Sequence, residues 1–438
     1  MRGVLGLLVA GLACIGTLAG CASSRLGPLR PPIDSDVTGP ISLPKLGQPT
    51  PVALASLSLP SHQAVEKALA RKSEIAGYRL LVESQCQCLA AAESTQGNLL
   101  SAERQSVLAG GGDRRDRDGQ ARSVLADVLG LRAVEERNRS AALAMELYYR
   151  LAAAYFTRDQ LDRSVEEVRH SIEDFRKAKG TGLSVPGDEA KLLTQEIDLA
   201  DRKVQLDSGI QQMDEQLCQL LGLQREWSQP LWPGAEMTVT VSPIDATAVV
   251  AAGLYSRPDL AMLCVLRENI NEQTLSAVRS ALGRIDPLMG IPGPKKHMVC
   301  VALNRARVLL ESQARQSQLD QLLEAEKRSA ETEIRREAGD VETRLHRVGL
   351  AKDKVDQSRD LLRRLRQRRE AKGAVQSSEI SAAQVDLLRA ESDAFQAVAE
   401  WKIALVKLKQ SQCLLTAECG YPLPATCCES CLNPSASE

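Results

Sequence analysis

The sequence predicts an all-α fold made of two tandem copies of a long antiparallel helical hairpin, with strands short or absent. One observation is composition: Ala, Leu, Glu, Arg and Gln are abundant, whereas aromatic residues make up only 3%. The other is periodicity, because the same apolar heptad pattern occurs in two segments 188 positions apart. A chain of 438 residues exceeds one ordinary globular core, which favours several domains or one extended repeat architecture.

Composition also excludes several classes of protein. The 55 basic and 56 acidic residues give a net charge of -1, which argues against a nucleic-acid-binding protein. No apolar run of about 20 residues follows the N-terminus, so a polytopic helical membrane protein is excluded. The scarcity of aromatic residues argues against a large transmembrane β-barrel. What remains is a protein of long, water-soluble helices.

The N-terminus has the parts of an export signal in order. Met1-Arg2 is followed by an apolar stretch and then by Leu18-Ala19-Gly20-Cys21. This segment resembles a bacterial lipoprotein signal, and the resemblance implies cleavage after residue 20, acylation of Cys21 and delivery to the outer membrane. An uncleaved anchor or a plain secretory signal is the alternative. The segment 21–60 contains eight prolines, which predicts an extended lipid-anchored tether.

Two heptad series define the repeat. Each steps by seven residues, and equivalent members differ by 188 positions: Leu192, Leu199, Leu206, Met213 and Leu220 in one, and Ile380, Leu387, Ala394, Trp401 and Leu408 in the other. The halves are predicted at 61–223 and 246–413, joined by a linker at 224–245 in which Met237 to Val241 alternates like a strand.

Each half is expected to contain long helices that return on themselves. The expected helices are 61–109, 121–179 and 187–222 in the first half, and 246–282 with a break before Pro258, 297–371 and 377–413 in the second. A helix of 59 residues spans about 88 Å, so its apolar stripe must meet a partner along its length, as in a coiled coil.

The cysteines favour disulfides over a metal site. Ten of the twelve remain after Cys14 and Cys21 are set aside, and five lie at the C-terminal end, most within the tail 414–438. No histidine lies near them, so disulfide pairing is favoured, with its connectivity open. Cys86 and Cys88, two apart on a helix, are poor partners for each other. No nucleophile–base group, phosphate loop or metal motif occurs, so no enzymatic activity, cofactor or metal is predicted.

Several segments together resemble the TolC-like outer membrane efflux protein family, over about 57–415. In chain order they are Leu59-Pro60 with Ala64, Ala68-Leu69 and Ser73-Glu74-Ile75; Tyr148, Tyr149, Ala154, Tyr155 and Phe156; Leu220-Leu221-Gly222; Ser256-Arg257-Pro258-Asp259-Leu260; and Glu391 to Leu408. The resemblance implies a homotrimer whose helices form a periplasmic α-barrel that continues into an outer-membrane β-barrel. It also implies partnership with an inner-membrane pump and a periplasmic adaptor, or membrane fusion protein.

The sequence departs from this family where the membrane strands belong. The corresponding intervals are 110–120, which alternates Asp and Arg, and 283–296, which holds three prolines. A membrane hairpin needs roughly 22 residues, so neither interval can supply one. The β-barrel strand insertions are therefore predicted to be missing.

The resemblance also points to candidate sites. It implies adaptor docking at the hairpin tips, Gly182, Leu183 and Ser184 in one half and Gly373, Ala374 and Val375 in the other; plain helix–helix turns are the alternative. Glu379 falls where the family carries an acidic residue at the channel constriction, although a solvated acid at a helix N-terminus is the favoured interpretation. The basic run from Arg359 to Lys372 suggests an anionic partner or, more simply, a solvated helical face.

The predicted function is therefore a TolC-like outer membrane efflux component, lipid-anchored with its body in the periplasm. Its helical tunnel would serve transport or secretion together with a pump and an adaptor. A non-pore structural or adaptor coiled-coil lipoprotein is the alternative, and an enzyme regulator acting through the Cys-rich tail is a third.

Overall fold

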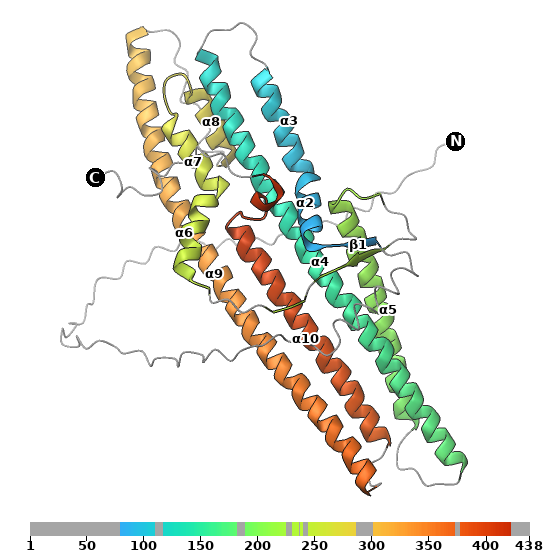
Figure 1. The fold of residues 1–438 in the computed structure, drawn as a ribbon. Helices are drawn as coiled ribbons and strands as arrows, with labels where there is room; N and C mark the ends of the chain where they lie inside the picture. The colour runs from blue at the N-terminus through green and yellow to red at the C-terminus, as the bar shows by residue number, and fades with distance from the viewer. Residues whose placement is uncertain are drawn as a thin grey trace, which may run out of the picture. The chain divides into compact units, whose positions relative to one another are not determined.

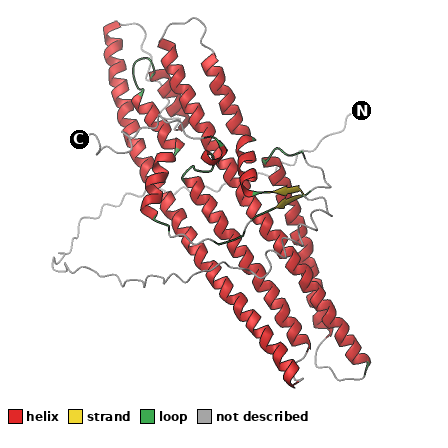
Figure 2. Ribbon diagram, viewed as in Figure 1, coloured by secondary structure: helices red, strands yellow, loops and turns green. Residues whose placement is uncertain are grey.

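The structure is a computed structural model that describes residues 79–109, 117–181, 189–224, 230–235, 237–239, 244–285, 301–372 and 377–421. All of them lie within one compact unit, Leu54–Glu438. Nearly all described residues are helical, as Figure 2 shows. The predicted all-α class is therefore confirmed for the described part of the chain.

Two long antiparallel hairpins dominate this unit. The first joins α4, Arg117–Gly180, to α5, Glu189–Leu220, and the second joins α9, Val301–Lys372, to α10, Ser377–Ser411. All four lie close to the ranges expected from the heptad pattern, so the duplicated hairpin is confirmed. Helix α10 packs against both α9 and α4, and Figure 1 shows it lying between them. The two halves therefore share one continuous helical layer.

Shorter helices flank the N-terminal halves of α4 and α9, at the top of Figure 1. They are α2, Glu83–Ala92, α3, Thr95–Ala109, α6, Ala246–Ser256, α7, Pro258–Glu268, and α8, Leu275–Ile285. Helices α2, α3, α7 and α8 contact α4, while α6 and α7 contact α9. The expected single helices at 61–109 and 246–282 were thus too simple. In the first, residues 79–81 form a short strand instead of helix, the helix that begins at 83 breaks at 93–94, and residues 61–78 lie outside the description. The second has an additional break at 269–274.

The break before α7 was predicted and has a local cause. Pro258 occupies the first helical turn, where its missing N–H costs no hydrogen bond, and Arg257 before it is extended. Asp245 caps α6 by accepting from the backbone N–H groups of Thr247 and Ala248. Within the described ranges no single helix has the length and hydropathy of a membrane span. Taken together, α6 and α7 meet those criteria, with a bend of 51° between them.

The strands of the described chain form one small parallel pair. Strand β1, Arg79–Leu81, pairs with β2, Leu231–Pro233, in the register Leu80 to Trp232. The buried Asp214 of α5 accepts a hydrogen bond from the Leu231 backbone N–H at 2.8 Å and so fixes β2 to the first hairpin. The strand expected at 237–241 is wrong for residues 237–239, which form no ladder; the pairing lies six residues earlier instead.

The main core lies where the shorter helices and β1 and β2 meet the long ones. Tyr148 is fully buried on α4, and its hydroxyl donates to the Leu81 carbonyl at 3.1 Å. Tyr155 packs on Trp232 of β2 with 4.7 Å between ring centroids. The aromatic stretch noted in the sequence is therefore the place where α4, the linker and β1 are held together.

Candidate tunnel wall and hairpin ends

The first hairpin is held by an apolar seam and a ladder of ion pairs. Its seam is a buried cluster formed by Val165, Val168, Ile172 and Leu199. Beside it, Arg158 pairs with Asp207 at 2.7 Å, Lys203 with Asp162, Arg169 with Glu196 at 2.6 Å and Arg176 with Glu189 at 2.8 Å. Residue numbers rise along α4 as they fall along α5, as an antiparallel pair requires.

The second hairpin repeats this construction. Its seam is a buried cluster formed by Val355, Leu362, Ile380, Ala383, Leu387, Ala390 and Ala394. Lys354 pairs with Asp393 at 2.6 Å, Arg344 pairs with Glu400, and Arg359 reaches Glu391 at 3.5 Å. Burial raises the pKa of Glu391 above its usual range, although Arg359 and Arg163 oppose the shift. This carboxyl is therefore partly desolvated in the seam.

A second seam joins the two halves along α4 and α10. Phe156 and Phe395 stack with ring centroids 4.1 Å apart and planes inclined by 6°. Beside this stack, the hydroxyls of Thr157, the next residue of α4, and Ser392 are 2.9 Å apart. Further along, the Ser381 hydroxyl donates to the Glu167 carbonyl at 3.3 Å. The halves are thus bonded to each other along much of α10, and α10 is an internal helix of the unit.

The start of the second half is anchored by Arg257. Its guanidinium donates to Asp259 at 2.7 Å, to Glu333 of α9 at 2.6 Å and to the Ser411 carbonyl at the end of α10 at 3.1 Å. The side chain is 16% exposed, and the hydrogen bonds to Asp259 and Glu333 raise the pKa of Arg257 against the opposing effect of burial. The Arg-Pro-Asp motif therefore ties together α7, α9 and the C-terminal end of α10.

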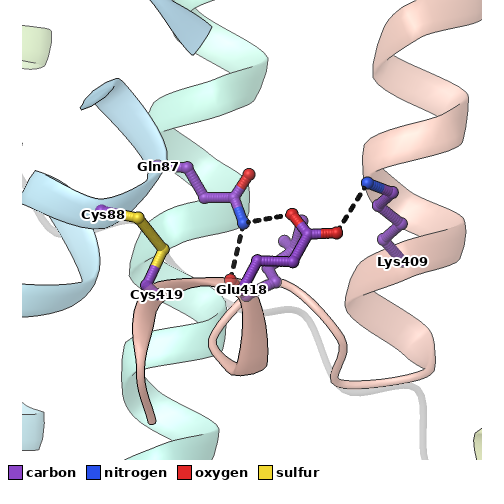
Figure 3. Close-up of a disulfide and its surroundings, with 6 residues drawn as sticks. Gln87, Cys88, Lys409, Glu418 and Cys419 are labelled. Carbon is purple, nitrogen blue, oxygen red and sulfur yellow. Dashed lines mark hydrogen bonds and ion pairs between the residues drawn. A yellow bond between two sulfur atoms is a disulfide. The ribbon is translucent and has the colours of Figure 1, made fainter. Parts of the chain in front are cut away.

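A disulfide fastens the C-terminal segment to the first half. Cys88 of α2 is bonded to Cys419 in the short 3-10 helix η1, Ala417–Cys419. Figure 3 shows the polar contacts beside it: Gln87 donates to the Leu415 carbonyl at 2.6 Å and to Glu418 at 3.0 Å. Lys409 donates to Glu418 from the other side at 3.0 Å. Of the C-terminal cysteines that the structure describes, Cys419 is therefore paired, with a partner that the sequence did not identify, whereas Cys413 is a buried free thiol, so disulfide pairing is wrong for Cys413.

The neighbouring thiol has a different environment. The Cys86 side chain is fully buried, and burial raises the pKa of this thiol to about 12. The Cys86 thiol points at the Ala144 carbonyl of α4, 3.8 Å away, and not at the C-terminal segment. The prediction that Cys86 and Cys88 do not pair with each other is confirmed, and only Cys88 reaches the tail.

The sequence-predicted site residues have different outcomes. Glu379 lies exposed in the first turn of α10, next to the buried Ile380. The six residues of the two hairpin tips, and the lipidation site Cys21, lie outside the described residues. The intervals 110–120 and 283–296 also lie mostly outside them; residues 117–120 belong to α4 and 283–285 to α8. No group of three or more His, Cys, Asp and Glu side chains is placed to hold a metal in the described ranges.

No family model matches this sequence, and no curated protein matches it. Solved structures do match its fold. The channel protein CusC superimposes with a TM-score of 0.55 at 12% identity, covering 74% of this chain and 91% of its own. The outer membrane protein VceC of Vibrio cholerae gives 0.50 at 12% identity over 80% and 96% of the two chains. The outer-membrane channel OprN gives 0.50 at 16% identity over 68% and 71%.

These likenesses identify the fold. The duplicated helical hairpins of this chain have the architecture of outer membrane channels of the TolC-like kind, and the predicted resemblance is confirmed at that level. The coverage of more than nine tenths of VceC and CusC shows that the match extends over the whole arrangement and is not limited to one coiled-coil segment.

Proposed function

We propose that this protein is the outer membrane component of a TolC-like efflux or secretion assembly. Three copies would place their hairpins side by side around a periplasmic tunnel, with the acylated Cys21 anchoring each copy to the outer membrane. An inner-membrane pump would supply the energy, and a periplasmic adaptor would dock at the tips around Leu183 and Ala374. The tunnel itself would act passively, and its walls would be α4, α5, α9 and α10.

The observation that carries this proposal is the joint between the halves. A helical hairpin that served only as a spacer would need its own seam and nothing more. Here α10 also packs against α4 through Phe156 and Phe395, so the four long helices form one layer in the order α9, α10, α4 and α5. A layer of this kind leaves edge helices available for further copies, which is what a tunnel wall requires.

Glu379 supports a gate at the tip end of this wall. It lies exposed in the first turn of α10, at the hairpin end, where no described side chain pairs with it. In a trimer three such carboxylates would surround the axis and attract cations. Glu379→Gln is therefore expected to lower cation selectivity without changing the oligomeric mass.

The decisive experiment is planar-bilayer conductance of the purified, lipidated protein, with its oligomeric mass measured on the same sample. Trimers with discrete conductance steps would support the proposal. Stable trimers without conductance would indicate a tunnel that needs another outer membrane component. Monomers without conductance would refute the proposal and favour a structural or adaptor coiled-coil lipoprotein.

A further inference from the structure

The C-terminal end of α9 carries an excess of positive charge that the fold does not require. Its last fourteen residues, 359–372, contain seven basic and two acidic residues, a net of five positive charges. The last fourteen residues of α4, 167–180, contain four basic and three acidic residues, a net of one. Since α4 and α9 occupy equivalent places in the repeat, hairpin formation alone does not explain the difference.

Contacts within the chain neutralise only the first part of this segment. Arg359 is paired with Asp356 and Glu391, and Arg363 is paired with Asp360 at 2.8 Å. These pairs account for two of the seven basic residues. The arginines after Arg363 have different partners.

The next four arginines, Arg364, Arg366, Arg368 and Arg369, are all exposed. Arg364 donates to the backbone carbonyl of Asp360, and Arg366 donates to the neutral Gln384. Within the described residues none of the four has a carboxylate partner. We call them the arginine cluster.

The cluster is not explained as helix stabilisation. Cations favour a helix C-terminus only within the last turn, and Arg364 and Arg366 lie further back. Arg364 and Arg368 are also four residues apart on one face, where like charges destabilise a helix. A solvated helical face needs charged residues but no excess of one sign, and the equivalent end of α4 carries both signs in nearly equal number.

We propose that the arginine cluster is a docking surface for an acidic protein segment, presented at the end of the second hairpin only. This proposal rests on the proposed function, because it specifies the chemistry of the partner that meets the hairpin ends. Exposed guanidinium groups bind carboxylates through paired hydrogen bonds. The surface would also steer an acidic partner towards one of the two hairpins and so fix its rotational register.

A lipid surface is the other ligand with this charge, and the structure favours it less. Helices that lie on membranes combine basic residues with an apolar face available for the bilayer interface. Two of the three leucines of this segment are already used in the seam between α9 and α10: Leu362 is 4% exposed, and Leu365 packs against the buried residues of that seam. Leu361 is 46% exposed and is the one large apolar side chain that the described part of this segment presents to solvent. One exposed leucine does not make a continuous apolar face, so the arginine cluster offers charge without a face for insertion.

The test uses the full-length lipidated protein in detergent and a fluorescent helical peptide in which Glu alternates with Ala. A peptide with Gln in place of Glu is the neutral probe. The variant Arg364→Gln/Arg368→Gln/Arg369→Gln removes three charges from exposed positions with a good helix former. The matched control, Arg176→Gln/Lys177→Gln/Lys179→Gln, removes three charges from the equivalent end of α4. A third variant replaces the same three arginines with Lys.

We expect the acidic peptide to bind in a salt-dependent manner, with affinity about tenfold weaker in the α9 variant and nearly unchanged in the α4 variant. The Lys variant should retain most of the affinity. Equal losses in the α9 and α4 variants would overturn the proposal, since they would reflect general charge attraction. Binding to vesicles of equal phosphatidylglycerol and phosphatidylcholine, with none to the peptide, would overturn it in favour of a membrane.

Oligomeric mass and conductance, measured on the same samples, separate this proposal from the proposed function. Conducting trimers whose peptide affinity is insensitive to the arginine cluster would refute the docking surface and leave the tunnel intact. Arginine-dependent peptide binding by a non-conducting monomer would refute the tunnel and leave the acidic docking surface standing.

Discussion

Removing the Cys88–Cys419 disulfide should lower the free energy of unfolding by several kcal/mol. The bridge joins residues 331 positions apart, so it restricts the unfolded chain strongly. The chain-entropy relation gives about 6 kcal/mol at 25 °C for a loop of this size, and measured disulfides usually contribute about 2–4 kcal/mol. We expect the lower range, because a compact unfolded ensemble already limits the freedom that the bridge removes.

The assay is urea denaturation followed by helical circular dichroism, comparing the wild type with Cys88→Ala/Cys419→Ala. A reductant should shift the wild-type midpoint down to that of the double variant and leave the double variant unchanged. The second condition is the control for the other cysteines. Hydrogen exchange should also accelerate in α2 and η1, where Gln87 and Glu418 would have to hold the tail alone.

Two results would refute this reasoning. If the double variant unfolds at the wild-type urea concentration, the bridge does not restrict the unfolded state as described. If the reductant lowers the midpoint of both proteins equally, the stabilising bridge lies elsewhere in the chain.

Three further predictions concern the helical seams. Phe156→Ala should destabilise the unit by about 3–5 kcal/mol by opening a cavity against its stacked partner, as measured by urea denaturation; Phe156→Leu should cost clearly less. Arg257→Lys should lower the unfolding midpoint, because an ammonium cannot keep the forked contacts with Asp259 and Glu333; an unchanged midpoint would contradict the anchoring role. Because burial raises the folded-state pKa of Glu391, its ionisation penalises the folded state at neutral pH and not below the unfolded-state pKa. Glu391→Gln should therefore be more stable than wild type at neutral pH, with the difference shrinking as the pH falls through the pKa of Glu391; a difference independent of pH would exclude this explanation.

Periodic features were the ones that sequence reasoning predicted well. The heptads place Leu199 and Leu387 in equivalent seams, and both are buried there. Such seams can be predicted from local sequence, because a long helix with an apolar stripe must bury that stripe against another helix. Pro258 similarly predicted the start of α7 from its own backbone geometry.

Contacts between distant segments were missed for the complementary reason. Strand β1 is three residues long and pairs with β2 about 150 positions later, so neither shows a period that a sequence window can detect. The pairing of Cys88 with Cys419 was equally hidden, since an even number of cysteines permits many connectivities. Alternation at Met237 suggested a strand, but alternation without a partner gives no ladder.

The candidate site was predicted unevenly. Arg257 was recognised as part of a motif, yet its contact with Glu333 depends on how α7 lies against α9 and could not be derived from the motif. The basic run on α9 was visible in the sequence, where a solvated face was the favoured interpretation. Only the contacts show that Arg359 and Arg363 are neutralised and that the following arginines are not.

The stacking of Phe156 on Phe395 bears on how such a chain could have arisen. In the repeat, α10 is the counterpart of α5, and both are the second helix of their hairpin. Helix α4 packs against both of them, one from its own half and one from the other half. A half-length ancestor could have formed the second of these contacts only between separate molecules. Fusion of two gene copies would then have converted an association that depended on concentration into a permanent one. Separately expressed halves of the present chain should accordingly still recognise each other through this aromatic pair.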